Sequence, residues 1–452
     1  MGKLFHEIRD PLYAFVKFTH DERKVIDSRP FQRLRHIHQL AMTSLVYPGA
    51  THKRFEHSLG VMELSGRVFD TITHPDNILS DVRELFLELK DPEIMSYWRT
   101  VLRIAALCHD LGHLPFSHAA ESDLLPEGWD HERLTMEIIQ SGEMKDIWNA
   151  MIPSPKIEHI VKLALGPKKA AKYGIKNFTD WEAILSELIV GDAFGVDRMD
   201  YLLRDSHHTG VAYGRFDHYR LIDTLRILTL PPTMGPGGAS KETMLGVEEG
   251  GLQSAEALLL ARYFMFTQVY CHPVRRIYDI HLKDFLASWL PEGVFSINMD
   301  EFLSMTDNEV ISALRHCAFS RSGAGCEHAI KIIYRQHFKE LYRRYPDDIA
   351  KNPEAVESVY KAVKDKFGEQ SVRKDLYIQK GNSFDFPVLK KDERIASSYS
   401  LSLTLQRLPP VAVGYVFIER SVHEEAREWL ERNRMDILKP LSARGRESNG
   451  TA

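Results

Sequence analysis

Residues 99–118 read RTVLRIAALCHDLGHLPFSH. The part Arg99–Leu107 becomes apolar nearly all round towards its end, which is typical of a helix that is buried on most sides. Such a helix carries Cys108, His109 and Asp110 into the interior of the protein. Because two ionisable side chains are costly there unless they are paired or bound to a metal, the pattern predicts a metal ligand pair at the end of a buried helix.

The sequence after this helix is rich in histidine. Gly112 is expected to end the helix, and His113 and His118 follow within a few residues. Asp130 is the predicted N-cap of a further helix that begins at His131. Four histidines, counting His109, therefore lie in this part of the chain.

Two distant segments complete a candidate metal site. His57 stands in RFEHSLG (54–60) and Asp197 in GVDR (195–198). Imidazole and carboxylate ligands together suit Fe, Mn, Zn, Ni or Mg better than an ion that prefers thiolates, and four protein ligands leave positions open for water and substrate. A divalent ion in such a site activates water and polarises a phosphoryl oxygen near neutral pH. The four residues predict metal-dependent hydrolysis of a nucleotide, with the identity of the metal left open.

Helical spacing places more polar side chains beside these ligands. Arg54 and His57 are three residues apart and share a helix face, where phosphate oxygens could reach both. Asp197, Tyr201 and Asp205 form an i, i+4, i+8 stripe that could meet the phosphate, the sugar ring and a sugar hydroxyl of a nucleotide in turn. The alternatives are a surface arginine, a core tyrosine and a solvated carboxylate.

Three longer strings have high specificity. They are IDSRPFQRLR (26–35), HKRFEHSLGV (52–61) and LCHDLGH (107–113). With them the chain resembles the HD-domain deoxynucleoside triphosphate triphosphohydrolases, both the vertebrate enzymes that carry a SAM domain and their bacterial relatives. The resemblance is dense from residue 26 to 218, returns at 262–272 and then fades. It implies a mainly α fold with an HD-domain helical core, and hydrolysis of dNTPs to a deoxynucleoside and tripolyphosphate.

The resemblance also implies roles for individual residues. The implied metal ligands are His57, His109, Asp110 and Asp197. The implied catalytic residues are Asp197 again and the phosphate-side histidines His113, His118 and His131, with His118 as the acid that protonates the departing 5′ oxygen. The deoxyribose would lie against Gln39, Leu40, Tyr201, Asp205 and Tyr270, and the triphosphate, with a second Mg²⁺, against Arg54, Arg198, Arg262 and His272. The chain departs from the best-known relative at Arg198, where that enzyme has lysine, and at Phe266, where it has histidine.

A further set bears on regulation. Asp27, Gln32 and Arg35 match a site that, in the resembling enzymes, holds an activating guanine nucleotide at a subunit interface. A carboxylate can accept hydrogen bonds from guanine N1 and N2, and arginine offers a planar fork to an acceptor edge or a phosphate. We therefore expect a homo-oligomer, a dimer or a tetramer, that a guanine nucleotide activates. The alternative is a salt bridge at a helix start.

Composition limits the partners. The net charge of −5, from 58 basic and 63 acidic residues, argues against general attraction to a nucleic acid. The one basic cluster, Lys168, Lys169, Lys172 and Lys176, favours a solvated loop over a nucleic-acid patch. No apolar run approaches the roughly 20 residues that span a bilayer. The four cysteines form no Cys-x-x-Cys motif, so we expect reduced thiols, a cytoplasmic location and no membrane partner.

The organisation of the chain is expected to be bipartite. An HD phosphohydrolase domain at 1–290 would be followed by a C-terminal α+β oligomerisation or regulatory region at 291–452, with a disordered tail from 444. A small β-hairpin is predicted from 225–230 and 243–247, and a long helix from 253–289. In the C-terminal region, 400–405 and 411–418 are predicted strands, the first half-buried and the second central. A capping box at 421–424 predicts a last helix.

Two other classes of function remain open. Another HD phosphohydrolase, acting on an alarmone, a cyclic dinucleotide or a nucleoside monophosphate, would share the metal core. A non-catalytic regulator that binds nucleotides or single-stranded nucleic acid would keep the pocket without turnover. The residues expected at the deoxyribose favour a dNTP over the first alternative, and the complete ligand set argues against the second.

Overall fold

The computed structural model describes residues 5–117, 123–230, 242–379 and 384–439. The chain forms two compact units that are both discontinuous in sequence. The first comprises Met1–Met265, Val294–Val310 and Ser383–Pro409, and the second Phe266–Gly293, Ile311–Asn382 and Pro410–Ala452. The mainly α class and the α+β character of the C-terminal region are confirmed. The functional domains 1–290 and 291–452 stay a prediction, and the tail from 444 lies outside the described residues.

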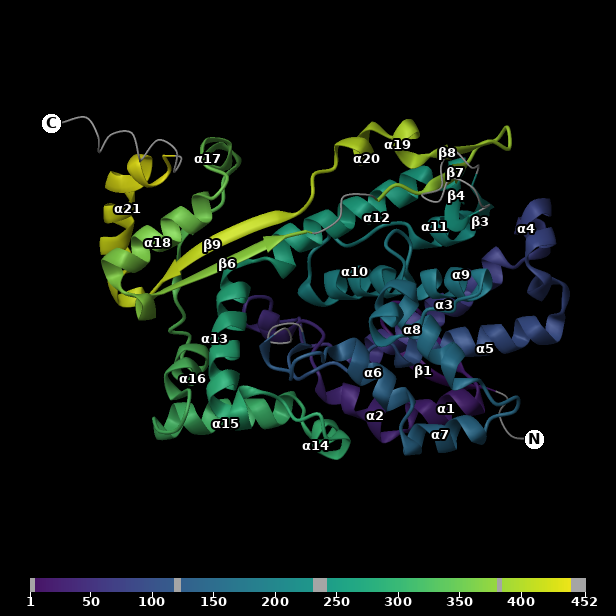
Figure 1. The fold of residues 1–452 in the computed structure, drawn as a ribbon, viewed down its shortest axis with the longest axis horizontal. Helices are drawn as coiled ribbons and strands as arrows, with labels where there is room; N and C mark the ends of the chain where they lie inside the picture. The colour runs from purple at the N-terminus through teal and green to yellow at the C-terminus, as the bar shows by residue number, and fades with distance from the viewer. Residues whose placement is uncertain (1–4, 118–122, 231–241, 380–383, 440–452) are drawn as a thin grey trace. The chain divides into compact units, whose positions relative to one another are not determined.

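Helices make up most of the first unit (Figure 1). They are α1 (His20–Ile26), α2 (Arg29–Arg33), α3 (Arg54–Ile72), α4 (Ser80–Leu85), α5 (Pro92–Cys108), α6 (His131–Ile139), α7 (Gly142–Asn149), α8 (Ile157–Ala170), α9 (Asp180–Val190), α10 (Val196–Thr209), α11 (His218–Thr224), α12 (Leu252–Met265), α14 (Met299–Ser304), α19 (Ser398–Leu401) and α20 (Leu403–Arg407). The closest packing joins α3 to α5 and α10, and α8 to α5 and α9. Among all described residues, no helix is both long and apolar enough to cross a membrane.

The buried helix predicted before His109 is α5. Asp91 caps its N-terminus by accepting from the amides of Glu93 and Ile94 at 2.8 and 3.3 Å, and Pro92 occupies the first turn. Every residue from Val101 to Cys108 is buried. Burial on all sides therefore carries the next two residues into the core, as the sequence pattern predicts.

Helices α3 and α10 cross in close contact because of a glycine. A Cβ atom at Gly60 would lie 1.9 Å from Oδ1 of Asp200 and 2.5 Å from an Nη atom of Arg204. No side chain larger than hydrogen fits between these helices without a shift. Gly60 thereby brings the first turn of α3 within reach of α10.

The first unit contains two small sheets. Strands β1 (His6–Asp10) and β2 (Ala14–Phe18) form an antiparallel hairpin at the N-terminus. The second sheet has the order β3-β4-β7-β8, with β3 (Leu225–Thr229), β4 (Thr243–Glu248), β7 (Pro387–Leu389) and β8 (Ile395–Ser397). The antiparallel β3–β4 pair confirms the predicted hairpin, and β7 joins β4 in parallel from far along the chain.

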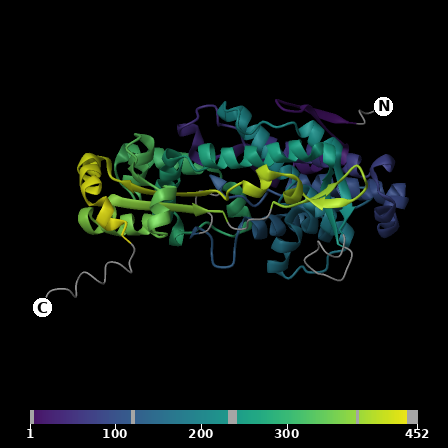
Figure 2. The same cartoon turned by 90° about the horizontal axis from the view of Figure 1, so that it is seen from above.

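The second unit packs helices on a three-stranded sheet. The sheet order is β5-β9-β6, with β5 (Lys339–Arg343), β6 (Val372–Ile378) and β9 (Ala412–Ile418), and both pairings are antiparallel. Its helices are α13 (Pro273–Trp289), α15 (Asp307–Ser320, whose first turn belongs to the first unit), α16 (Cys326–Ile333), α17 (Pro346–Lys351), α18 (Ala355–Phe367) and α21 (His423–Ile437). Figures 1 and 2 both show β6 and β9 side by side. Strand β9 lies between β5 and β6 and is the central strand, as predicted. An apolar core fills the space between the sheet, α18 and α21.

Three local predictions are wrong. Residues 400–405 form parts of α19 and α20, not a strand, because Ser397 and Ser402 act as N-caps that accept from backbone amides at 3.2 and 3.0 Å. The helix expected at 253–289 is interrupted by a π-helical turn, Phe266–Tyr270, before Pro273 begins α13. The last helix exists, but Val422 precedes it and provides no side-chain cap.

Candidate metal centre

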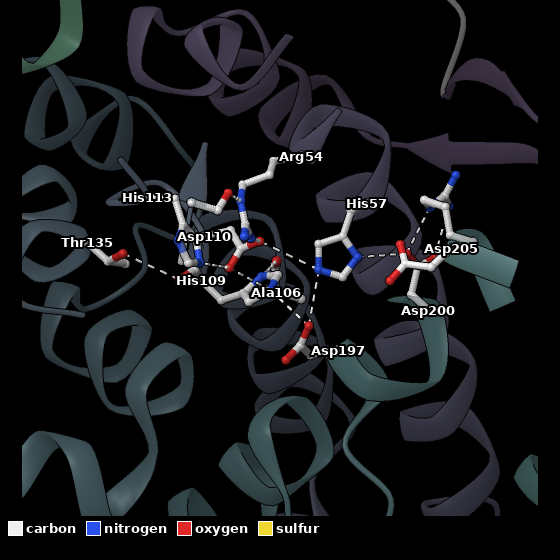
Figure 3. Close-up of polar contacts among 12 residues, drawn as sticks. Arg54, His57, Ala106, His109, Asp110, His113, Thr135, Asp197, Asp200 and Asp205 are labelled. Carbon is white, nitrogen blue, oxygen red and sulfur yellow. Dashed lines mark hydrogen bonds and ion pairs between the residues drawn. The ribbon is translucent and has the colours of Figure 1, made fainter. Parts of the chain in front are cut away.

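Three elements bring the candidate ligands together (Figure 3). Helix α3 provides Arg54 and His57 in its first turn. The end of α5 provides His109 and Asp110, and the first turn of α10 provides Asp197. All of these residues belong to the first unit.

The imidazoles and carboxylates face one another at short distances. Nε2 of His57 lies 3.1 Å from Oδ1 of Asp197 and 3.6 Å from Oδ2 of Asp110. Nε2 of His109 lies 3.4 Å from Oδ1 of Asp110 and 3.6 Å from Oδ1 of Asp197. Both imidazoles and Asp110 are buried, whereas the side chain of Asp197 is 34% exposed and leaves the group open on one side. The four residues from distant segments therefore lie close together, and three of them, His57, His109 and Asp110, have ligand atoms within 4.8 Å of one another.

The tautomers of both histidines fit a metal ion. Nδ1 of His57 donates to Oδ2 of Asp200 at 2.8 Å, and Nδ1 of His109 donates to the carbonyl oxygen of Ala106 at 2.7 Å. Nε2 of His57 lies in hydrogen-bond contact with Asp197 at 3.1 Å, and once a metal ion replaces the proton there, both Nε2 lone pairs face the space between the carboxylate oxygens. Nε2 of His109 is buried and makes no hydrogen bond to any described residue. Lone pairs that converge on carboxylates repel unless a cation lies between them, so this donor set suits a divalent ion.

The raised pKa of His57 shows that the surrounding carboxylates favour a positive charge at this ring. Burial alone would lower this pKa, but the hydrogen bonds to Asp197 and Asp200 raise it to about 10. Protons and metal ions compete for the same nitrogen atom. A divalent ion would satisfy the carboxylates without the proton.

A buried network behind His57 was missed by the sequence analysis. Asp200 accepts from His57, from the hydroxyl of Tyr13 at 2.8 Å and from two nitrogens of Arg204 at 2.9 Å each. Arg204 also donates to Asp10 at 2.9 Å. Burial would raise the pKa of Asp200, but Arg204 and the bond from His57 hold it at about 2. The only sequence signal was the Asp200–Arg204 spacing of four on one helix.

A second group of residues surrounds Asp110. Arg54 donates through Nη1 to Oδ2 of Asp110 and through Nε to Oγ of Ser117 at 2.7 Å. Nε2 of His113 lies 3.1 Å from Oδ1 of Asp110, and its ring stacks on His131 with centroids 4.2 Å apart. Burial, Arg54 and His131 lower the pKa of His113 well below its usual value, so the ring is neutral at pH 7.

Helix α6 brings His131 to this group as the sequence predicted. The side chain of Asp130 accepts from the amide of Arg133 at 2.9 Å and caps the helix. His118, predicted as the catalytic acid, lies outside the described residues.

The residues expected at the deoxyribose lie partly on α10. Asp205 is buried and pairs with Nε2 of His52 at 2.7 Å, a partner that the sequence analysis did not assign. Oε1 of Gln39 is buried and makes no hydrogen bond to a described residue. Leu40, the next residue in the chain, is buried as well. Tyr201 is half-buried on α10. Their contacts with a sugar stay a prediction.

The residues expected at the triphosphate divide between the two units. Arg198 donates to the carbonyl of Gly191 at 3.4 Å, and its Nε atom is buried with no hydrogen bond to a described residue. Arg262 lies over the ring of Phe384 in the first unit. Tyr270 and His272 belong to the second unit, where His272 caps α13, so their part in the site stays a prediction.

Two of the three predicted effector residues line a cavity of the first unit. Asp27 and Arg35 border a cavity of about 340 Å³ together with His6, Glu7, Phe18 and Arg23. Asp27 pairs with Arg23 at 3.0 Å, and Arg35 lies 3.5 Å above the ring of Phe55. Gln32 accepts from Nε of Arg35 at 2.8 Å. The carboxylate and the guanidinium thus border one hollow.

The second unit contains another histidine and aspartate group, with less suitable chemistry. His281, Asp284 and His328 offer ligand atoms within 4.8 Å of one another. The amide of Phe338, however, donates to Nε2 of His281 at 3.3 Å. A neutral His281 ring then carries its proton on Nδ1, so neither nitrogen is free for a metal. Arg373 also neutralises Asp284 at 3.1 Å.

The comparisons with known proteins agree with the site. Residues 54–205 match the HD domain, and residues 216–372 match the HD associated region. A solved structure of a hypothetical protein from Aquifex aeolicus is 32% identical, with a TM-score of 0.73, and the match covers 94% of this chain and 100% of that one. The chain therefore belongs to the HD-domain phosphohydrolase family. HD domains bind divalent metals, and His57, His109 and Asp110 can hold one here.

Two curated relatives show the range of this family. An uncharacterized protein of Methanocaldococcus jannaschii is 33% identical over 68% of this chain and 54% of its own length. The deoxynucleoside triphosphate triphosphohydrolase SAMHD1 of Bos taurus is 35% identical over 49% of this chain and 38% of its own length. The chain thus spans about half the length, or less, of these relatives.

Proposed function

We propose that the protein hydrolyses deoxynucleoside triphosphates to a deoxynucleoside and tripolyphosphate, in the cytoplasm. The observation that carries this proposal is the convergence of Nε2 of His57 and of His109 on Asp110 and Asp197. Similarity to a deoxynucleoside triphosphate triphosphohydrolase supports the substrate class.

The reaction needs a water molecule, an acid and a neutralised phosphate. Held by His57, His109, Asp110 and Asp197, a divalent ion would supply the Lewis acid that polarises the phosphoryl oxygen and activates water. Water adds to the α-phosphorus and releases one proton to the solvent, the bond from phosphorus to the 5′ oxygen breaks, and the acid, assigned to His118, protonates that oxygen and is then reprotonated from the solvent.

The phosphate-side residues support the rest of the mechanism. Neutral His113 borders Asp110 without adding positive charge, and His131 stacks on its ring. Arg198 contributes a guanidinium whose Nε atom is buried and makes no hydrogen bond to a described residue. Such a donor suits a phosphate oxygen of the substrate. A second Mg²⁺ would accompany the triphosphate.

The substrate and the products test this proposal. Purified chain of known metal content is incubated with each deoxy- and ribonucleoside triphosphate, singly and in pairs, and the products are identified by mass. Release of intact tripolyphosphate with a deoxynucleoside is the expected result. Orthophosphate or pyrophosphate instead would assign the chain to another HD phosphohydrolase, such as one acting on an alarmone, a cyclic dinucleotide or a monophosphate. No turnover at all would favour a nucleotide-binding regulator.

We also propose that a guanine nucleotide activates the enzyme by assembling a homo-oligomer. The cavity that Asp27 and Arg35 border supports this proposal, because it offers a carboxylate and a guanidinium to one ligand. Sedimentation and turnover of a second nucleotide are measured with and without added dGTP or GTP. If neither changes, the activation is wrong, whereas the hydrolytic reaction stands or falls on product analysis alone.

A further inference from the structure

The lysines in the last turn of α8 and in the 3₁₀ turn that follows it, Ala171–Tyr173, are not equivalent. Nζ of Lys169 lies 2.5 Å from Oε1 of Glu132 on α6, and its side chain is 42% exposed. Lys168 and Lys172 pair with Asp192 at 2.9 Å and with Asp130 at 4.0 Å, and their side chains are 90% and 61% exposed. The sequence interpretation of this cluster as a solvated loop is wrong for Lys168 and Lys169, which lie in the last turn of α8, and Lys169 also pairs with Glu132.

The backbone holds Lys169 in place. Gly166 adopts φ 72°, ψ 164° inside α8, and the chain resumes helical geometry at Pro167 for one more turn. A Cβ atom at Gly166 would lie 2.8 Å from Cγ2 of Val190, so this kink packs closely against α9. Lys169 thus projects from a turn that follows a kink packed against α9, and its ammonium group reaches α6.

The ammonium group lies within electrostatic range of the metal centre. Burial would lower the pKa of Lys169, but Glu132 raises it above its usual value, and the charges of Asp197 and Asp110 raise it further. Its partner Glu132 is adjacent to His131 and lies 3.2 Å from Nδ1 of that ring. Lys169 is thus connected to the phosphate-side histidines through one carboxylate.

The negative charge of the expected substrate exceeds the positive charge that a metal ion and Arg54 leave available to it. A divalent ion would be offset by Asp110 and Asp197, and Arg54 is already engaged with Asp110 and Ser117. A triphosphate brings about four negative charges, and such groups bind cationic donors strongly.

More cations lie close to the Lys169 turn. Burial raises the pKa of Asp192, but Lys168, Arg198 and Arg262 lower it overall, so these cations lie near one carboxylate. Arg198 directly follows the ligand Asp197 in sequence. Lys168, the neighbour of Lys169 in sequence, and Arg198 at the start of α10 thus act on the same carboxylate.

We propose that Lys169 is a further contact for the phosphate tail of the substrate, where its ammonium exchanges Glu132 for a phosphate oxygen. This inference rests on the proposed function of the same site. Glu132 keeps the ammonium oriented in the absence of substrate, and the flexible lysine stem allows the exchange.

Binding of inorganic tripolyphosphate tests the proposal without turnover. The full chain is saturated with Mg²⁺ and titrated calorimetrically with the magnesium complex of tripolyphosphate. Lys169→Ala should weaken binding roughly tenfold or more, because a charge-assisted contact is lost. Lys169→Arg should restore most of the affinity. Lys172→Ala, in the next turn of the chain and paired with Asp130, should change the affinity less than about twofold, which controls for general loss of positive charge.

The outcomes separate this inference from the proposed function. Equal affinity in Lys169→Ala and the unaltered chain, an equal loss in Lys172→Ala, or no binding of tripolyphosphate by the unaltered chain would each overturn the role of Lys169. A chain that binds tripolyphosphate through Lys169 but releases none from a dNTP would keep the contact and refute the reaction. Matching melting temperatures of the two alanine variants show that both are folded.

Discussion

At the scale of single residues, one turn of α10 provides both a candidate metal ligand and the residue that orients another ligand. Asp197 faces the two Nε2 atoms, while Asp200, three residues on, accepts the proton of Nδ1 of His57. Arg204, one more turn along, fixes Asp200 with two hydrogen bonds. Since the partner of Nδ1 determines which nitrogen can bind a metal, Asp200 sets the ligand orientation of His57.

Asp200→Asn should therefore weaken metal binding. The amide keeps the size of the side chain but loses the charge that stabilises the Nδ1 proton and that pairs with Arg204. We expect metal affinity to fall about 10- to 100-fold, as is common for the partners of ligand histidines. Competition with a chelator of known affinity measures the change.

Asp205→Asn is the matched control for this substitution. Asp205 is a buried carboxylate on the same helix that pairs with His52 instead of a ligand. Metal affinity should stay unchanged in this variant. If both variants lose metal to the same extent, the effect is a general disturbance of α10 and Asp200 has no special role.

The sequence predicts the ligands better than the residues behind them. His57, His109 and Asp110 stand in strings long enough to be specific, and their burial follows from helical patterns. Asp200 has no such mark, because an acidic residue four positions before an arginine usually forms an ordinary surface pair on a helix. Its contact with Tyr13, and that of Arg204 with Asp10, come from the N-terminal hairpin, which no local pattern connects to α10.

At the scale of elements, the approach of α3 and α10 depends on Gly60. Gly60→Ala would place a methyl group on Asp200 and Arg204, and the helices would have to separate. We expect a loss of about 2 kcal/mol in the free energy of unfolding, since overpacking outweighs the helix propensity gained. Metal affinity should fall as well, because His57 is on the same helix as Gly60. Urea unfolding and chelator competition measure both effects.

Gly142→Ala controls for the change of residue type. Gly142 lies in the first turn of α7, where an added Cβ would meet nothing within 4 Å. Its stability should be unchanged or slightly higher. An equal loss in both variants would contradict the steric explanation.

The contact between α9 and β4 predicts a pH dependence. Glu187 on α9 accepts from the amide of Leu245 on β4 at 3.2 Å. Burial raises its pKa from the usual 4.5 to about 7, although the Leu245 amide acts in the opposite direction. Between pH 4.5 and 7 the unfolded chain releases a proton that the folded chain retains, so stability falls as pH rises through this window.

Glu187→Gln should remove this slope. The variant should be more stable than the unaltered chain by about 2 kcal/mol at pH 8, after allowance for partial exposure, and equal to it near pH 4. Urea midpoints at several pH values provide the measurement. A constant difference at every pH would show that the carboxyl group does not titrate in this range.

Element type was predictable where one pattern dominated. The burial of α5 and β9 follows from continuous apolar sequence, and both predictions are confirmed. Alternation at 400–405 is equally compatible with two short helices once Ser397 and Ser402 cap them. Capping competes with strand pairing in such short segments, so periodicity alone could not decide.

At the scale of the whole molecule, the first unit is assembled from three parts of the chain. Asp307, from the segment Val294–Val310, accepts from the amides of His38 and Phe116 at 2.7 Å each. Strand β7, from Ser383–Pro409, pairs with β4 through Val247 and Val388. Periodicity and turn signals describe neighbours in sequence, so they gave no indication that these later segments return to the first unit.

Truncation tests whether the returning segments are needed. A fragment of residues 1–290, which is the predicted HD domain, lacks Asp307 and β7. It leaves the amides of His38 and Phe116 unpaired and one edge of β4 uncovered, which costs more than a marginally stable unit can lose. We expect no cooperative urea transition and no bound metal ion.

A fragment of residues 1–409 is the matched control, because it also lacks a C-terminal part but keeps all three segments, and it should retain a transition and one metal ion per chain. If 1–290 unfolds cooperatively and binds metal as well as 1–409 does, the segments 294–310 and 383–409 are dispensable, and the metal centre is complete in the first 290 residues.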